Sequence, residues 1–195
     1  LVNPGDEVII PTPYWVSYSE LVKLGEGTSV FIDTTLESDF KITPEELEAA
    51  ITPKSKLFMF SSPNNPTGTV YTRDELAALV KVFEKYPDIY IISDEIYEHI
   101  NFLDAHVSIA EFESIKDRVI IINGLSKAYA MTGWRLGFSA SSKEIANACD
   151  KLQSQMTSGT CSITQKAGIA AYNGSLDSVK EMQVVFEKRR NLVYD

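Results

Sequence analysis

The sequence has 195 residues, of which 44% are hydrophobic and 23% are charged, as in an ordinary soluble globular protein. The formal net charge of -9 and the pI of about 4.8 argue against nucleic acid or an anionic membrane as the main partner. We find no apolar run of membrane-spanning length and no signal peptide, so we expect a cytoplasmic protein that does not contact a membrane. Cys149 and Cys161 have neither metal-ligand spacing nor a disulfide pattern, which favours a reducing compartment and no metal site.

Apolar runs and helical patterns alternate along the first half of the chain. Thr43 and Thr72 each stand three residues before a glutamate, which is the capping-box signature of a helix start. Runs of β-branched and aromatic residues that are bounded by turn residues predict strands. In chain order, the patterns predict a strand at 7–11, a helix at 16–24, a strand at 29–33, a helix at 43–51, a strand at 56–61, a helix at 72–85 and a strand at 89–93.

The second half continues this alternation and ends inside a helical pattern without a stop signal. It predicts a short helix at 108–112, strands at 119–122 and 135–140, and helices at 142–156, 162–173 and 176–195. Continuous apolar strands that alternate with helices are typical of a largely parallel sheet covered on both faces. We find no internal repeat and no linker, so we expect residues 1–195 to belong to one domain of a longer protein.

Residues whose side chains could take part in catalysis or ligand binding follow the expected strands. In open α/β sheets, ligands bind beyond the carboxyl ends of the strands. Each residue alone has an ordinary explanation, such as packing, turn formation or a surface ion pair. The residues at or just beyond these ends are Trp15, Asn65, Asp94, Tyr97, Lys127 and Arg135.

Lys127 lies in a glycine- and serine-containing turn, residues 124–137, that follows the buried strand 119–122. A lysine at the end of a buried strand is expected to be poorly solvated, which favours the neutral, nucleophilic amine. A neutral amine can form a Schiff base with a carbonyl compound. Most lysines are solvated on the surface, so a lone Ser-Lys pair would not carry this interpretation.

The whole set fits an aromatic aldehyde phosphate. An acid could hold a pyridine nitrogen protonated, a guanidinium could bind a phosphate, and an aromatic side chain could stack on the ring. A phenol and an amide could hydrogen-bond a ring oxygen, and the lysine could form the Schiff base. Lysine paired with an acid in this way is typical of sites for pyridoxal 5'-phosphate (PLP).

The sequence resembles the class I and II aminotransferases of fold type I, and within them the bacterial aspartate aminotransferases. The resemblance covers essentially the whole chain, and its motifs stand in the family's order. It rests on residues 3–6, 13–18, the Asn-Pro-Thr-Gly loop at 62–68, the Asp-x-x-Tyr element at 93–97 and the PLP-attachment motif at 124–137.

The resemblance implies a three-layer α/β/α fold with a mostly parallel sheet, in which the strand at 135–140 is antiparallel. The chain would be the major part of the PLP-binding large domain. The helix at about 176–195 would lead toward an absent small domain that carries a carboxylate-binding arginine. Cis peptide bonds are implied before Pro13 and Pro66.

The resemblance also implies roles for the polar residues. Lys127 would form the Schiff base with PLP and then act as the base that moves a proton at the substrate. Asp94 would pair with the ring nitrogen, while Tyr97 and Asn65 would hydrogen-bond the phenolic oxygen of the ring. Asn65 would also contact the substrate α-carboxylate.

Three further residues belong to the implied site. Arg135 would hold the phosphate, and Trp15 would stack on the ring and line the substrate site. Some members of the family have a phosphate-binding serine where Gly124 stands here, so Ser126 is a candidate to contact the phosphate instead.

The implied activity is amino transfer between an L-amino acid, with aspartate favoured, and a 2-oxo acid such as 2-oxoglutarate. The implied assembly is a homodimer, with residues 157–161 near the partner subunit. We expect the 195 residues alone to be inactive. Two alternatives stay open: a related fold type I enzyme such as a PLP-dependent C–S β-lyase, and a PLP-fold sensing module of a regulator.

Overall fold

The computed structural model describes residues 1–103 and 105–194, which form two compact units. Unit 1 comprises Leu1–Glu95 and Val107–Ile121, and unit 2 comprises Ile96–His106 and Ile122–Asp195. Strand β5 (Val119–Gly124) contributes its first half to unit 1 and its second half to unit 2. The expectation that residues 1–195 belong to one domain stays a prediction.

Unit 1 contains the elements that the sequence patterns predict, with boundaries shifted by at most two residues. Besides the first half of β5, the elements of unit 1 are β1 (Glu7–Thr12), α1 (Ser17–Leu24), β2 (Thr28–Asp33), α2 (Pro44–Ala50), β3 (Ser55–Ser61), α3 (Arg73–Phe83), β4 (Tyr90–Asp94) and the 3-10 helices η1 (Ile109–Glu111) and η2 (Lys116–Arg118). The short helix η2 is not predicted by the sequence.

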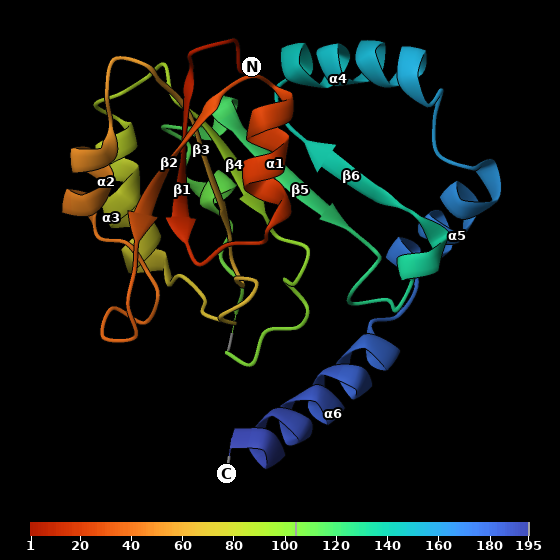
Figure 1. Cartoon of the computed structure of the whole chain (residues 1–195). Coiled ribbons are helices and arrows are strands. Elements are labelled where there is room, and N and C mark those ends of the chain that lie inside the picture. Colours follow the sequence, from red (N-terminus) through yellow and green to blue (C-terminus); the bar gives the residue numbers. More distant parts are fainter. Residues whose placement is uncertain (104, 195) are drawn as a thin grey trace. The chain divides into compact units, whose positions relative to one another are not determined.

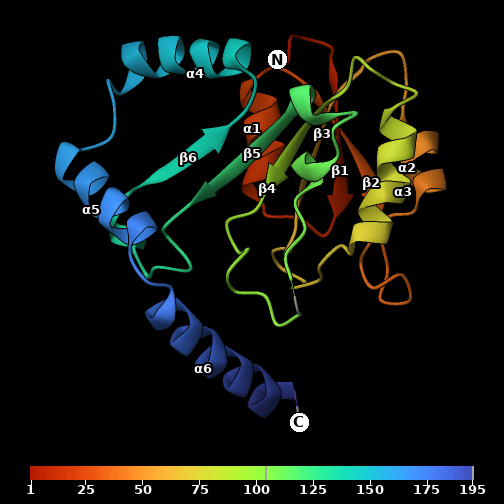
Figure 2. The same ribbon diagram turned by 180° about the vertical axis from the view of Figure 1, so that it is seen from behind.

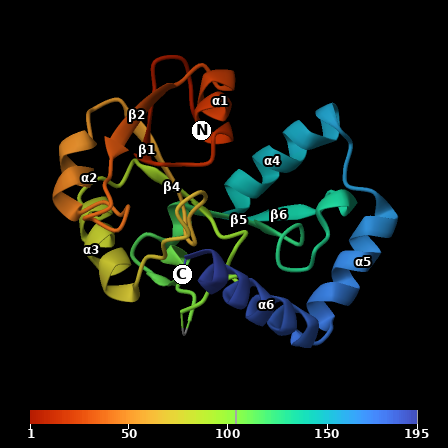
Figure 3. The ribbon, with the colours of Figure 1, turned by 60° about the horizontal axis from the view of Figure 1, so that its bottom comes forward.

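Unit 2 contains the second half of β5 and the C-terminal helices, which follow one another along the chain (Figure 3). Its elements are the 3-10 helix η3 (Thr132–Trp134), β6 (Gly137–Ala140), α4 (Lys143–Met156), α5 (Ser162–Asn173) and α6 (Asp177–Tyr194). None of the described helices combines the length and the apolar composition that crossing a membrane requires.

The six strands form one sheet in the order β2-β1-β3-β4-β5-β6. The pairs β1–β2, β1–β3 and β3–β4 are parallel. Strand β6 lies beside β5 and runs in the opposite direction (Figure 1). The mostly parallel α/β fold with an antiparallel strand after the lysine turn is therefore confirmed.

Helices cover both faces of the sheet in unit 1. Successive residues of a strand point to opposite faces, so alternate residues pack against different helices. Helix α1 lies in front of the strands in Figure 1 and behind them in Figure 2. Val8, Ile10, Leu57 and Met59 pack with Tyr18 and Val22 of α1. The alternate residues Ile9, Phe58 and Phe60 pack with α2 and α3 through Leu47, Leu76 and Phe83. Unit 1 thus has the expected three layers.

Capping boxes start α2 and α3 as the sequence predicts. The Thr43 backbone N–H donates to Glu46 Oε2 at 2.7 Å, and the Glu46 N–H donates to Thr43 Oγ1 at 3.2 Å. Thr72 and Glu75 make the same pair of bonds at 2.7 and 3.3 Å. Each box satisfies two backbone donors that have no partner within the helix.

In unit 2, the turn after β5 depends on a close approach of backbone to backbone. A Cβ atom on Gly124 would lie 2.8 Å from both the Gly137 Cα and the Leu136 carbonyl oxygen. Ala130 and Arg135 have φ values of 53° and 55°, a left-handed conformation that non-glycine residues rarely adopt. A left-handed residue cannot belong to a β-strand, so Arg135 lies before the strand. Strand β6 starts at Gly137, and the expected start at residue 135 is wrong.

Replacing Gly124 by alanine is expected to destabilise the protein, because the new methyl group meets backbone atoms that cannot rotate away. Overpacking of this kind costs about 1–3 kcal/mol of the free energy of unfolding. Equilibrium unfolding in urea measures the loss. Gly133→Ala is the matched control, since its Cβ would meet no atom within 4 Å. Equal stability of the two variants would contradict this explanation.

Candidate active site

The carboxyl ends of β3 and β4 lie side by side in unit 1. The parallel register pairs Ser61 with Asp94, and the Ser62 backbone N–H donates to the Asp94 carbonyl oxygen at 3.2 Å. This register brings the polar loop after β3 next to the acid that ends β4. Ligands of open α/β sheets bind at such ends.

The loop after β3 is held by Asn64. The Asn64 Nδ2 donates to the Pro13 carbonyl oxygen at 3.1 Å and to Thr67 Oγ1 at 2.9 Å, while its Oδ1 accepts from Ser61 Oγ at 2.8 Å. The neighbouring Asn65 is half-buried, and its backbone N–H donates to the same Ser61 hydroxyl at 3.4 Å. Asn64 therefore fixes the backbone from which the expected site residue Asn65 projects.

Three peptide bonds around this loop are cis. The bonds before Pro13 and Pro66 were expected, and both expectations are confirmed. The Ser62–Pro63 bond is also cis, and no sequence pattern indicates it.

Asp94 is a buried acid with a buried partner. It is 9% exposed, and its Oδ2 accepts a hydrogen bond of 2.8 Å from the hydroxyl of Tyr18, which is 4% exposed. Trp15 packs edge-on against Tyr18 with 5.8 Å between ring centroids, and it is 44% exposed. Unit 1 therefore connects Trp15 to Asp94 through Tyr18, a residue to which the sequence assigns no separate role.

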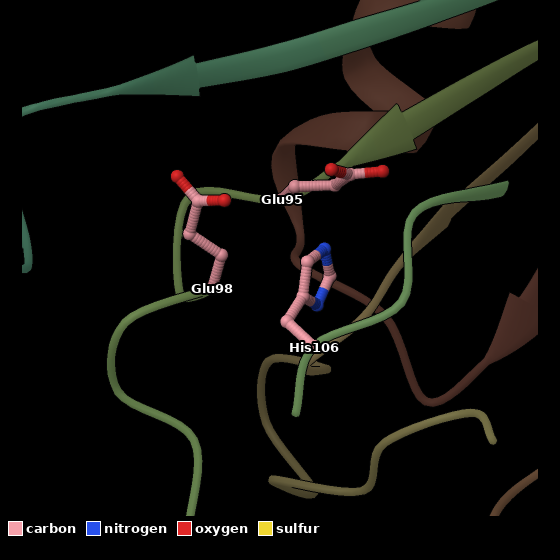
Figure 4. A group of neighbouring side chains, drawn as sticks. All are labelled: Glu95, Glu98 and His106. Atoms are coloured by element: carbon pink, nitrogen blue, oxygen red, sulfur yellow. The ribbon is translucent and has the colours of Figure 1, made fainter. Parts of the chain in front are cut away.

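The acid that follows Asp94 has a different environment. Glu95 is 3% exposed and accepts hydrogen bonds from Ser93 Oγ at 2.9 Å and from Ser108 Oγ at 2.7 Å. Glu98 lies further along the same turn (Figure 4), and it accepts from Asn123 Nδ2 at 2.8 Å within unit 2. Two hydroxyl donors stabilise the buried Glu95 carboxylate, which is a structural role.

In unit 2, Tyr97 and Lys127 lie together. The Lys127 Nζ is 5.5 Å from the centroid of the Tyr97 ring, a distance that allows a cation–π contact. The chain turns sharply around the lysine, because the Ala130 N–H donates to the Lys127 carbonyl oxygen at 3.1 Å and the Met131 N–H donates to that of Leu125 at 3.2 Å.

The expectation that Lys127 is poorly solvated is wrong for the described chain. Leu125 and Ala128 are buried, whereas the Lys127 side chain is exposed. The reason is that the chain leaves β5 in a tight turn, in which Leu125 and Ala128 are buried and the Lys127 side chain is left exposed. The amine is therefore accessible to a ligand from solvent.

Ser126 and Arg135 are joined through Thr132. The Thr132 Oγ1 donates to the Ser126 carbonyl oxygen at 2.8 Å, and Arg135 Nη1 donates to the Thr132 carbonyl oxygen at 3.0 Å. The Arg135 side chain is exposed, so its remaining N–H groups can reach a ligand. No sequence signal marks Thr132 as a link between these residues. The left-handed conformation of Arg135 cannot be anticipated either, because such a conformation is normally indicated by a glycine.

Beside Arg135 lies a cavity of about 770 Å³ within unit 2, which Trp134, Thr160 and Cys161 also line. Helix α5 begins at this cavity, and the backbone N–H groups of Thr164 and Ile163 hold the pKa of the Cys161 thiol below its usual value. A guanidinium and the amides of a helix N-terminus favour an anion here.

A family model described as aminotransferase class I and II matches residues 1–195. The chain belongs to this family. An aspartate/prephenate aminotransferase from Cereibacter sphaeroides is 50% identical over 194 residues, which are 98% of this chain and 48% of that protein. An aspartate aminotransferase from Geobacillus stearothermophilus is 50% identical over 197 residues, covering 100% of this chain and 50% of that protein.

Solved aminotransferase structures have the same fold. The crystal structure of the aspartate aminotransferase from Rhizobium meliloti matches with a TM-score of 0.97 at 44% identity, covering 99% of this chain and 49% of that chain. The enzyme from Thermus thermophilus with maleate matches with a TM-score of 0.93 at 38% identity. The chain thus spans about half the length of the relatives that it matches.

Replacing Asn64 by alanine is expected to lower the free energy of unfolding of the protein by about 2 kcal/mol. The change removes three hydrogen bonds and leaves partly buried polar groups without partners. Urea unfolding measures the difference. In the exposed control Asn3→Ala, which loses a bond of 3.3 Å to Asp6, the change should be under about 0.5 kcal/mol. An Asn64→Ala protein as stable as this control would show that the loop is held by other contacts.

Proposed function

We propose that the complete protein is a PLP-dependent aminotransferase that moves an amino group between an L-amino acid, aspartate in particular, and a 2-oxo acid such as 2-oxoglutarate. The observation that carries the proposal is the match to the aminotransferase family over residues 1–195, with relatives named aspartate aminotransferase at 50% identity. The accessible Lys127 beside Tyr97 supports it, since such a cofactor needs an amine that it can reach.

The residues present fit PLP. Asp94 offers a buried carboxylate, Lys127 offers an exposed amine, and Arg135 offers an exposed guanidinium next to a cavity that favours an anion. When bound, PLP supplies an aldehyde that condenses with primary amines and a ring that accepts electrons. The Asp94 carboxylate would hold a proton on the ring nitrogen, and Arg135 with Ser126 would bind the phosphate.

The remaining residues would orient the ring and the substrate. Tyr97 and Asn65 would donate hydrogen bonds to the phenolic oxygen of the ring, and Asn65 would also donate to the substrate α-carboxylate. Trp15 would cover one face of the ring. Lys127 would take the proton from the substrate Cα and later return one, as a general base and acid.

We also propose that the complete protein is a cytoplasmic homodimer. The loop at residues 157–161 is flanked by the exposed apolar side chains of Met156 and Ile163, which favours burial against a partner. Cys149 and Cys161 are free and exposed, in keeping with a reducing compartment.

Replacing Lys127 by alanine in the complete protein is expected to abolish the visible absorption band that forms when PLP is added. It should also lower kcat by more than about a hundredfold, because the change removes the amine that we assign to move the proton at the substrate. Absorbance titration and steady-state kinetics measure the two effects. Lys143→Ala, at the first residue of α4, should leave both unchanged. A full band in the Lys127→Ala protein would rule out the assigned role.

A panel of amino donors and acceptors tests the reaction class. We expect aspartate with 2-oxoglutarate to give oxaloacetate and glutamate, with no turnover when the 2-oxo acid is omitted. Prephenate is a second acceptor to include, because a relative at 50% identity is named aspartate/prephenate aminotransferase. Release of a thiol without a 2-oxo acid would favour the C–S β-lyase alternative. Binding of PLP without turnover of any donor would favour a sensing module. The 195 residues alone should show no turnover.

A further inference from the structure

Tyr18 is the second residue of α1, and its ring is fixed from several sides. The Tyr18 N–H donates to the Trp15 carbonyl oxygen at 2.9 Å. The ring packs edge-on against Trp15, and it stacks on Tyr14 with 6.4 Å between centroids and 12° between planes. Because these contacts hold the ring, the hydroxyl has little freedom to move away from its acceptor.

The acceptor is fixed as well. The register of β3 and β4 pairs Leu57 with Tyr90, Met59 with Ile92 and Ser61 with Asp94. Leu57 and Met59 pack with α1, so the alternation of side chains places Asp94 on the same face as Tyr18. The Ser62 N–H holds the Asp94 carbonyl oxygen at 3.2 Å.

The Tyr18–Asp94 hydrogen bond is short and buried, and its acceptor is a carboxyl group that can ionise. Its length is 2.8 Å, and the two residues are 4% and 9% exposed. A hydrogen bond donated to a carboxylate favours the ionised form, and burial disfavours it. Removing the hydroxyl would leave a buried acid with one donor fewer, which favours its protonated and neutral form.

We propose that Tyr18 is a positioning residue for Asp94: its hydroxyl keeps the carboxylate ionised and orients it toward the ring nitrogen of the cofactor. This inference rests on the proposed function, because only a protonated ring nitrogen needs such an acid. Tyr18 does not itself touch the cofactor in this role. Its effect therefore passes entirely through Asp94.

The test is a double-mutant cycle with Tyr18→Phe and Asp94→Asn in the complete protein. The dissociation constant of PLP is measured by absorbance titration, and kcat and KM for aspartate are measured separately. Tyr18→Phe should raise the dissociation constant about tenfold and lower kcat about tenfold, the effect of one hydrogen bond to a charged group, with KM unchanged. In the Asp94→Asn background, the same change should alter the dissociation constant by less than about twofold.

Tyr14→Phe is the matched control, since it removes a hydroxyl from the ring that stacks on Tyr18. Urea unfolding of the four apo proteins of the cycle gives a second readout, in which the same coupling between the two positions should appear. Equal effects of Tyr18→Phe in both backgrounds, or an equal loss in Tyr14→Phe, would overturn the proposal. Absence of PLP binding by the wild-type protein would instead overturn the proposed function, so the two failures are distinguishable.

Discussion

The parallel pairing of β3 with β4 is the constraint on which the chemistry of unit 1 depends. It sets Ser61 opposite Asp94, and the alternation of side chains then assigns the two consecutive acids to opposite faces. Asp94 meets the phenol of Tyr18 on the α1 side, while Glu95 meets the hydroxyls of Ser93 and Ser108. One register thus separates an acid with a proposed chemical role from an acid with a structural role.

In unit 2, a backbone contact plays the corresponding part. Gly124 allows the backbone at Leu136 and Gly137 to approach the end of β5, at the point where the chain leaves the sheet in a tight turn. That turn exposes Lys127 beside Tyr97, and the left-handed Arg135 ends it at the edge of a cavity. The residues that carry the proposed reaction are therefore placed by glycine and by backbone geometry more than by side-chain packing.

The sequence predicts most of this fold, because its signals are local. Capping boxes, apolar alternation and turn residues determine the helices and strands of unit 1 within two residues. The predictions fail where the cause is not local. Arg135 adopts a left-handed conformation that normally signals glycine, and Tyr18 contacts Asp94 across 76 positions of the chain. The exposure of Lys127 likewise depends on how the turn packs, which hydrophobic patterns do not encode. The resemblance to a family indicates the site residues, whereas the contacts of these residues depend on the three-dimensional fold.

The side chains of Asp94 and Glu95 point to opposite faces of the sheet, and this limits how β4 can change length during evolution. A single residue inserted within β4 after Tyr90 would exchange the faces of every following side chain, because the period of a strand is two. The shorter acid would then point toward Ser108 and the longer one toward the phenol of Tyr18. Insertions and deletions among homologues should therefore be confined to the turn at Pro87 and Asp88, where a length change leaves the register of β4 intact.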